Sequence, residues 1–321
     1  MDRYEILRPA GQGAYGIVLR ARIKESGKTV AIKKMTVTTR NRLQILRELC
    51  TLRNLHHSKV LKLVDVFCSR DSLSLVTEFV PYHLNDIITD PQRPKDDGFL
   101  RHFFIQILQG MKHMHSLGIM HRDLKPENIL VSSRCIVKIA DFGQACLYFK
   151  DEDREYEENV ATRQYRAPEL LFGSRRYTPS VDIWALGCIL AEFVNASALF
   201  PGHSDLEQIS RIFSVLGTPS EETWPSWNTM PDATKLIFDN MAPVEDMRVI
   251  VHTTNSAVID LFKRQVCLES SWRWSAAQLL RHSFFTTDLR DCQSVLQYRP
   301  HRERSLSVPR RLPRLRIGPH V

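Results

Sequence analysis

The sequence predicts an α+β protein with two lobes, a small β-rich lobe followed by a larger helical lobe. Over the first 80 residues the apolar side chains alternate in the manner of strands, and from about residue 98 the apolar spacing becomes helical. Strands that come first and helices that come later are not the βαβ alternation of a parallel sheet. We therefore expect residues 1–80 to form the first lobe and residues 81–288 to form the second.

The first lobe is expected to hold a hairpin, a helix and two more strands. Apolar residues alternate from Ile17 to Ile23, and the turn Ser26-Gly27-Lys28 leads into the second hairpin strand at Thr29. Leucines at every third position from Leu43 to Leu55 indicate a helix. The two further strands are expected over residues 60–66 and 73–80.

The second lobe is expected to be helical, and the chain to end in a basic tail. One long helix begins near residue 98 and carries apolar residues from Phe99 to Met114. Proline and arginine dominate after residue 298, and we expect residues 289–321 to form a disordered tail. The shorter helices are expected over residues 182–194, 205–216, 256–266 and 275–281.

Charge and composition exclude several classes of protein. The net charge is +8, but residues 298–321 hold seven arginines against Glu303 alone and supply +6 of it, which leaves +2 for the body of the chain. We therefore expect no nucleic-acid binding by the folded body. The longest apolar stretch near the middle, Ile183 to Ala191, is far shorter than the roughly 20 residues that span a bilayer. The seven cysteines form no C-x-x-C pair, so we expect an intracellular protein with reduced thiols and no membrane insertion.

A glycine-rich stretch near the N-terminus is the first candidate for nucleotide binding. Gly11 to Val18 matches G-x-G-x-x-G-x-V, a spacing that also serves dinucleotide folds and plain turns. A dinucleotide fingerprint opens a helix, whereas this loop runs into a strand, which favours a flap over the phosphates of ATP. Lys33 would be a surface lysine if it stood alone, but Glu48 in the next helix can pair with it and direct it at those phosphates.

The stretch His121-Arg122-Asp123-Leu124-Lys125-Pro126-Glu127-Asn128 is the most specific in the chain. Asp123 can accept the proton of an attacking hydroxyl, and Lys125 can neutralise charge on a phosphoryl group in transfer. Asn128 can hold a divalent ion together with Asp141, which follows a strand and precedes Phe142-Gly143. The alternative, a polar surface loop, does not explain the complete match.

Glu169, in the string Ala167-Pro168-Glu169, is expected to be a buried acid that requires a cation. Arg273 is the candidate partner.

These residues together resemble a eukaryotic protein kinase over about residues 4–286. Tyr165 to Glu169, Phe200-Pro201-Gly202 and Leu216 to Pro219 are similar to strings of the cyclin-dependent and mitogen-activated kinase group. Val160 to Arg163 and Asp205 to Gln208 most resemble the cell cycle-related kinase family, whose members are cyclin-dependent-kinase-like enzymes associated with cilia.

The resemblance implies the bilobal kinase fold, with ATP and Mg²⁺ as cofactors. It also implies a protein substrate that is phosphorylated on Ser or Thr, with a preference for a following proline. Thr77 falls at the position that guards the back of the pocket, and Thr162 would bridge Asp123 and Lys125. The implied nucleotide contacts are Ala10, Gly11, Gln12, Gly13, Ala14, Tyr15, Gly16, Ile17, Val18, Ala31, Lys33, Glu78, Val80 and Leu130.

The resemblance and single motifs also bear on partners and location. The helix string Leu43 to Glu48 departs from the cyclin-binding string of the group, which places a cyclin-like activator in doubt. Gln144 and Gln164 depart from the usual leucine and tryptophan near the substrate platform. Arg304 to Pro309 resembles a 14-3-3 site that needs phosphorylated Ser307. We expect the cytoplasm, the cilium and the nucleus as locations, and a catalytically inactive binding scaffold is the rival function.

Glu157 occupies the position at which the resembled family carries a phosphorylated threonine held by three arginines. Two of those arginines remain here, Arg47 and Arg122, and the third position falls near Cys146. We therefore hypothesise that a carboxylate facing two cations orders this segment without a phosphate. The alternative is a solvated residue in the acidic run from Asp151 to Glu158.

Overall fold

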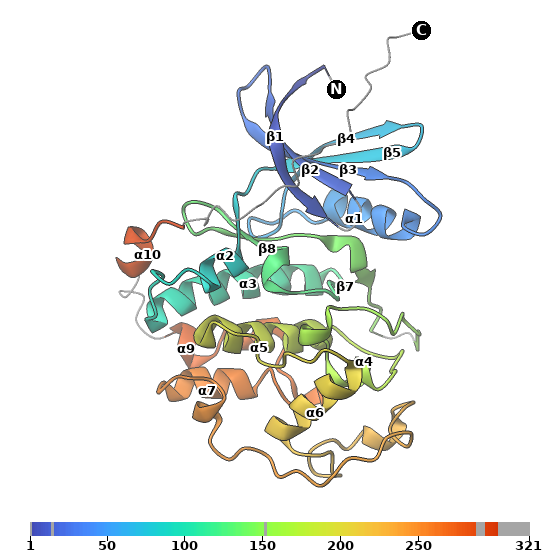
Figure 1. Ribbon diagram of the computed structural model, residues 1–321, viewed down its shortest axis with the longest axis vertical. Helices are drawn as coiled ribbons and strands as arrows, with labels where there is room; N and C mark the ends of the chain where they lie inside the picture. The colour runs from blue at the N-terminus through green and yellow to red at the C-terminus, as the bar shows by residue number, and fades with distance from the viewer. Residues whose placement is uncertain (1, 14–15, 151–152, 287–292, 301–321) are drawn as a thin grey trace.

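The computed structural model describes residues 2–13, 16–150, 153–286 and 293–300, which form two lobes joined by residues 79–81 (Figure 1). This architecture confirms the predicted α+β bilobal fold. The N-lobe holds one antiparallel sheet in the order β1-β2-β3-β5-β4, and helix α1 lies against it (Figure 1). Its strands are β1 Tyr4–Gly13, β2 Gly16–Ile23, β3 Thr29–Thr36, β4 Leu63–Ser69 and β5 Ser72–Glu78.

Helix α1 (Arg42–Asn54) buries a different face from the one that the leucine spacing suggests. Leu43 and Leu46 are 54% and 48% exposed, whereas Ile45 and Glu48 are buried. The predicted helix is present, but its leucines do not share one buried face. A step of three residues falls about 60° short of a full turn, so leucines at this spacing wind around the helix.

The segment after α1 contacts the C-lobe instead of the N-lobe sheet. We expected a strand from residue 60, but β4 begins at Leu63. Val60 instead bridges Ile139 in a parallel sense, and the Ile139 backbone donates to the Lys59 carbonyl (2.8 Å) and accepts from Leu61 (2.9 Å). The segment that follows α1 is thereby attached to the C-lobe.

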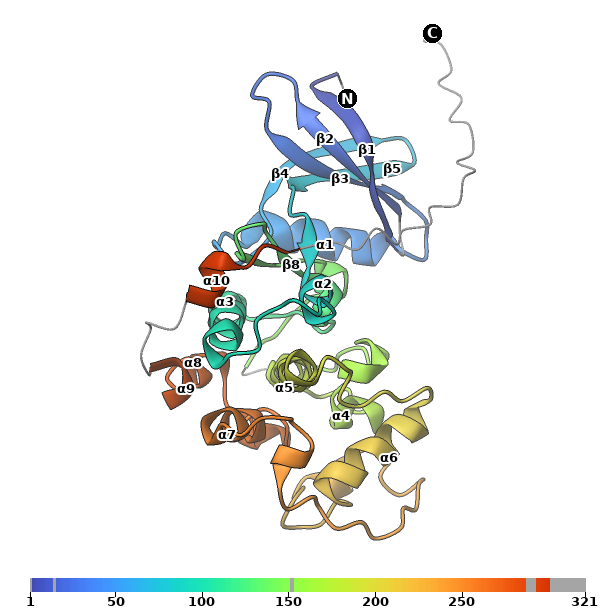
Figure 2. The ribbon, with the colours of Figure 1, turned by 60° about the vertical axis from the view of Figure 1, so that its left-hand side comes forward.

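The C-lobe is built around two long helices. Helix α3 (Asp97–Ser116) begins at Asp96, whose side chain accepts from the backbone of Phe99, and α5 (Ser180–Asn195) is buried along almost its whole length. The two helices run side by side through the centre of the lobe (Figure 2). The remaining helices are α2 Leu84–Ile88, α4 Pro168–Leu171, α6 Asp205–Leu216, α7 Ser256–Lys263, α8 Ala276–Leu279, α9 Ser283–Thr286 and α10 Gln293–Gln297. Short strands complete the lobe: β6 Tyr82–His83, β7 Ile119–Met120, β8 Ile129–Val131, β9 Val137–Ile139 and β10 Cys146–Leu147.

Part of the segment predicted as a disordered tail is folded. Within residues 289–321, α10 lies beside α3 (Figures 1 and 2), and Val295 and Tyr298 are buried. The Tyr298 ring packs edge-on against Phe99 at 5.1 Å, and its hydroxyl donates to Asp90. Apolar burial thus fixes residues 293–300, which corrects the predicted tail boundary. Within the described residues, no helix is both long enough and apolar enough to cross a membrane.

Candidate active site

A cavity of about 430 Å³ lies between the lobes. It contains most of the residues that the sequence indicates for nucleotide binding, together with Asn128 and Asp141. The predicted residues in its lining are Ala10, Gly11, Val18, Ala31, Lys33, Glu48, Thr77, Glu78, Val80, Asn128, Leu130 and Asp141. Residues that the sequence reasoning missed also line it: Leu61, Leu75, Phe79, Pro81, His83, Glu127 and Ala140. Of these, Phe79 lies between Glu78 and Val80, which the resemblance implies as nucleotide contacts, and Pro81 follows directly, so both could have been found from the sequence. The others join the lining only through the fold.

The described part of the glycine-rich stretch lies on β1, which ends at Gly13, and on β2, which begins at Gly16, and Gly11 and Val18 from these strands line the cavity. A Cβ atom on Gly16 would overlap the backbone carbonyl of Lys34 on β3, so only glycine fits there, whereas a Cβ on Gly11 meets no atom within 4 Å. Ile17 is 44% exposed and does not line the cavity, because its neighbour Val18 points inward and strand side chains alternate. Gln12 and Gly13 belong to β1, and Ala14 and Tyr15 lie outside the described residues.

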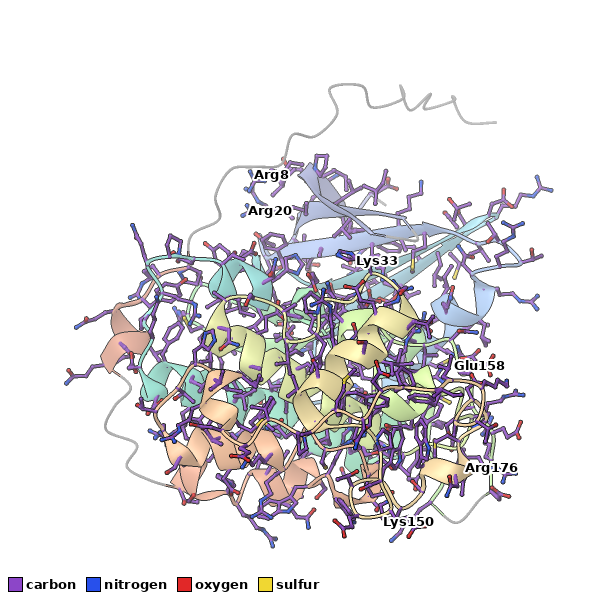
Figure 3. All side chains as sticks on the ribbon, turned by 60° about the horizontal axis from the view of Figure 1, so that its bottom comes forward. Arg8, Arg20, Lys33, Lys150, Glu158 and Arg176 are labelled. Atoms are coloured by element: carbon purple, nitrogen blue, oxygen red, sulfur yellow. The ribbon has the colours of Figure 1, made fainter. Side chains whose placement is uncertain are left out.

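Lys33 joins the two lobes through a pair of carboxylates. Its Nζ atom donates to both oxygens of buried Glu48 at 2.8 Å and to Asp141 Oδ1 at 3.4 Å (Lys33 is labelled in Figure 3). Burial alone would lower the pKa of Lys33, but Glu48 and Asp141 together raise it. Burial raises the pKa of Glu48, and the ammonium of Lys33 opposes this shift. The lysine is therefore a fixed cation at the inner end of the cavity.

The Asp123 carboxylate is held by donors on several sides. Its Oδ1 accepts from the backbone N–H of Thr162 (2.9 Å) and from the Thr162 hydroxyl (2.7 Å). Its Oδ2 accepts from Asn128 Nδ2 and lies 3.2 Å from both that atom and Lys125 Nζ. Lys125 in turn donates to the Thr162 hydroxyl at 2.9 Å, which is the bridge expected from the resemblance. A carboxylate held in this way is positioned to accept a proton.

Asn128 and Asp141 offer oxygen atoms that suit a divalent cation. Asn128 uses its Nδ2 to donate to the Asp123 backbone carbonyl (2.8 Å), which leaves its Oδ1 available as an acceptor. Burial opposes ionisation of Asp141, but Lys33 and then His121 outweigh it and hold the pKa of Asp141 below its usual value. A charged carboxylate and an amide oxygen are the hard ligands that Mg²⁺ prefers. The residues present therefore fit Mg²⁺ bound with a nucleotide.

Three residues with side chains adopt left-handed backbone conformations around the site. The φ angles are 65° at Arg122, 59° at Asp141 and 67° at Ala161. Such conformations cost about 1–3 kcal/mol each and persist only where the surroundings hold them. Each of these residues is next to, or part of, the proposed catalytic and substrate-binding segments. The positions of Asp123, Asp141 and Thr162 are therefore set by the backbone as well as by side-chain contacts.

Glu157 forms ion pairs with the two arginines that the sequence indicates. Arg47 contacts both of its oxygens, at 2.8 and 2.9 Å, and Arg122 Nη2 donates to Oε2 at 2.9 Å. Partial burial favours the neutral acid, but Arg47 and then Arg122 outweigh it and lower the pKa of Glu157. Tyr177 donates to the Glu157 carbonyl at 2.6 Å and accepts from Arg122 at 2.9 Å. The Glu157 side chain is 47% exposed, but both arginines engage its carboxylate, which favours the hypothesis of an ordering contact over a merely solvated loop residue.

A buried ion pair anchors the segment that follows. Arg273 donates to both oxygens of Glu169 at 2.7 and 2.8 Å, as the sequence predicts, and both side chains are almost fully buried.

Comparison with known proteins agrees with this geometry. Residues 4–285 match the protein kinase domain family. The chain is 42% identical over 295 residues to cyclin-dependent kinase 20 of Danio rerio, covering 90% of this chain and 85% of that relative. It is 37% identical over 294 residues to cyclin-dependent kinase 20 of Homo sapiens, covering 89% and 84% of the two chains. A chain in the structure of the CAK complex from Chaetomium thermophilum bound to ATP-gamma-S is similar with a TM-score of 0.82 and 32% identity, covering 89% of this chain and 92% of that one.

Proposed function

Because the chain belongs to the protein kinase family and is a serine/threonine kinase of the cyclin-dependent type, we propose that it transfers the γ-phosphoryl group of Mg-ATP to Ser or Thr residues that precede proline. The observation that carries the catalytic part is the Asp123 carboxylate, held by Thr162, Asn128 and Lys125 beside the cavity that contains Lys33 and Asp141. The scaffold alternative has no support, because Lys33, Asp123, Asn128 and Asp141 are all in place.

Each side chain has a distinct task in this proposal. Lys33 binds the α- and β-phosphates, and Glu48 keeps it charged and oriented. Asp123 accepts the proton of the substrate hydroxyl, and Lys125 lies 3.2 Å from Asp123 Oδ2, where it can offset negative charge on the group in transfer. Asp141 and Asn128 would hold Mg²⁺, which when bound neutralises phosphate charge. The apolar side chains of Val18 and Leu130 exclude water from the adenine end of the cavity.

The preference for proline rests on the backbone of Ala161. In its left-handed conformation, the Ala161 carbonyl accepts from Arg166 Nη2 at 2.9 Å, and Arg166 Nε donates to the Val160 carbonyl at 2.9 Å. These carbonyls are then engaged within the protein and are poor acceptors for an N–H of a substrate residue laid along the segment. A residue with a free N–H would lose a hydrogen bond to water there, whereas proline has no N–H to lose.

A paired peptide experiment tests this function. Purified full-length protein with Mg-ATP should phosphorylate a Ser-Pro peptide in preference to the matched Ser-Ala peptide. Arg166→Ala should reduce that preference more than it reduces the rate on the Ser-Ala peptide, because it frees both carbonyls. Equal rates on the two peptides with wild-type protein would refute the proline assignment. Absence of transfer to either peptide, with ATP binding intact, would refute the kinase activity.

We propose that the kinase does not need a phosphate on the segment around Glu157 to become active. Glu157 connects Arg47, next to Glu48 on α1, with Arg122, next to Asp123. In the unmodified chain the Glu157 carboxylate is the anion that links α1, the loop that carries Asp123 and the segment that contains Glu157 itself, which we call the activation segment. We expect protein produced without any activating kinase to be active already.

Partners and location complete the proposal. Leu43 and Leu46 on the exposed face of α1 support an activator that docks on this helix, and a cyclin-like protein is one candidate. Ser307, proposed as a 14-3-3 site after phosphorylation, lies outside the described residues. Membership in the cyclin-dependent group and the resemblance to the cell cycle-related kinase family support a role in cilium or cell-cycle signalling, in the cytoplasm, cilium or nucleus. If the isolated chain is as active as the chain mixed with a candidate cyclin, the proposed activator is contradicted. A phospho-Ser307 peptide that fails to bind 14-3-3 would contradict the 14-3-3 site. Absence of a tagged chain from cilia and nuclei would contradict the proposed location.

A further inference from the structure

Two arginines stand opposite each other on the N-lobe sheet, next to the connection between the lobes. In the β1–β2 ladder Arg8 pairs directly with Arg20, and Figure 3 shows both on the same edge of the N-lobe. Arg8 is exposed and Arg20 is half-buried. Among the described residues, neither arginine takes part in an ion pair with an acid.

This pairing differs from the rest of the same ladder. The ladder shifts register between Ile6 and Arg8 and again between Pro9 and Gly11, so the Arg8–Arg20 pair lies between two irregular positions. Like charges directly opposite in antiparallel strands are destabilising. Further along the two strands Glu5 lies opposite Arg22, with a salt-bridge distance of 3.6 Å. The sheet therefore carries one complementary pair and one repulsive pair on neighbouring positions.

The guanidinium of Arg20 is held in place. It lies 4.8 Å from the centroid of the Phe79 ring, a distance at which a cation is attracted to an aromatic face. Its Nε–H is buried and has no hydrogen-bond partner among the described residues. A buried donor without a partner costs free energy that a bound acceptor would recover. Arg20 is thus a guanidinium group held against Phe79, with one donor that has no acceptor among the described residues.

We propose that Arg8 and Arg20 form a binding site for a phosphorylated side chain, phosphoserine or phosphothreonine, of a protein partner. A phosphate monoester carries about −1.5 to −2 charges at neutral pH and three acceptor oxygens, which matches two guanidinium groups. A carboxylate carries a single negative charge and would leave the positive charge of the second arginine without a counterion. Planar guanidinium groups are well suited to bidentate phosphate contacts.

The site is separate from the nucleotide cavity but adjacent to it. Neither Arg8 nor Arg20 lines that cavity, so the proposal goes beyond the phosphotransfer function. Phe79, which carries the Arg20 guanidinium on its ring, does line the cavity. A partner bound here would therefore contact the connection between the lobes without blocking ATP.

A binding experiment on the full-length chain tests the site. The probe is a fluorescein-labelled alanine-rich peptide with one central phosphoserine, compared with the same peptide carrying serine or glutamate. Arg8→Ala and Arg20→Ala should each weaken binding about 10- to 100-fold, because each removes charge-assisted hydrogen bonds. Arg22→Ala, on the same strand but paired with Glu5, should leave binding unchanged. Inorganic phosphate should compete with the phosphopeptide.

Three results would overturn the assignment. Equal affinity for the phosphoserine and serine peptides would show that no phosphate site exists, and equal affinity for the glutamate peptide would reject the phosphate in favour of a carboxylate. Arg22→Ala binding as weakly as Arg8→Ala would show general charge attraction.

A stability measurement provides an independent test. Arg8→Glu places an acid opposite Arg20 and should raise Tm by about 1–3 °C while phosphopeptide binding is lost. A lowered Tm would show that the two side chains do not face each other. Phosphorylation of an unrelated peptide by Arg8→Ala protein should match wild type. Failure of the binding site would thus leave the phosphotransfer proposal intact, and the reverse also holds.

Discussion

Replacement of Glu157 by glutamine is the sharpest test of how this kinase is assembled. The change keeps the size of the side chain but removes its charge and replaces one acceptor oxygen by a donor that would face a guanidinium group. The carboxylate contacts Arg47 at 2.8 and 2.9 Å and Arg122 at 2.9 Å, and its side chain is 47% exposed. Arg122 keeps its bonds to Gln144 and Tyr177 in the variant.

The magnitude follows from these contacts. Charge-assisted hydrogen bonds contribute about 1.5–3 kcal/mol when buried, and exposed ion pairs about 0–1 kcal/mol. A half-exposed network with one fully buried guanidinium lies between these limits, at about 1–2 kcal/mol. If that free energy holds the activation segment in its ordered arrangement, Glu157→Gln should lower kcat/KM about 5- to 30-fold.

The assay is the initial rate of peptide phosphorylation by protein produced without an activating kinase. Glu158→Gln is the matched control, because the described contact of the Glu158 side chain is one long hydrogen bond from Asn159 at 3.5 Å. A Glu157→Gln enzyme within about twofold of wild type, or a wild-type protein that is inactive until it is phosphorylated, would refute the reasoning.

The same ion pairs predict a pH response. The arginines lower the pKa of Glu157, so the charged form favours the ordered state. The stabilisation is complete above the ordinary glutamate pKa and is lost only as pH falls through the lowered value. Between pH 8 and pH 6 this contact should therefore contribute no change in activity, whereas a phosphate, with a second pKa of about 6, would begin to lose charge there.

Three further substitutions test other parts of the structure. Asp123→Asn should reduce kcat by about 10²- to 10⁴-fold while ATP affinity measured by calorimetry is retained, and wild-type turnover would show that another group accepts the proton. Gly16→Ala should raise the KM for ATP because its Cβ meets the β3 backbone, whereas Gly11→Ala, which meets no atom within 4 Å, should not; equal effects would show that the fit at Gly16 is unimportant. Arg273→Leu leaves the Glu169 carboxylate buried without a partner and should lower the free energy of unfolding by about 3–5 kcal/mol in a urea titration, and a loss below about 1 kcal/mol would contradict that ion pair.

Motifs with local spacing could be predicted from the sequence with good accuracy. Helix α6 spans residues 205–216 as expected, and the hairpin strands around the turn at Gly27 agree closely. The partners Lys33–Glu48 and Glu169–Arg273 could be predicted because a buried charge requires an opposite one. In each of these pairs, a buried charged side chain requires a partner of opposite charge, which restricts the choice to a few residue types.

Features that depend on packing between distant segments could not be predicted. Val60 does not join the N-lobe sheet but bridges Ile139, which lies 79 positions away in the sequence. Tyr298 is buried because an aromatic cluster on α3 accepts it, although the composition around it resembles a disordered tail. Leu61 and Ala140 reach the nucleotide cavity through similar long-range contacts. Local periodicity carries no information about such contacts.

The segment behind α1 is attached to the C-lobe, so the two ends of this helix are held by different parts of the molecule. The helix ends at Asn54, the chain is fixed shortly afterwards where Lys59 and Leu61 bond to the Ile139 backbone, and Arg47 and Glu48 lie roughly 10 Å back along the helix from Asn54, at 1.5 Å per residue. Because the chain behind the helix is fixed, we expect loss of the Glu157–Arg47 contact to loosen the part of α1 that carries Glu48. Hydrogen exchange should then show protected amides near residues 59–61 even in Glu157→Gln protein, with increased exchange confined to the N-terminal half of α1.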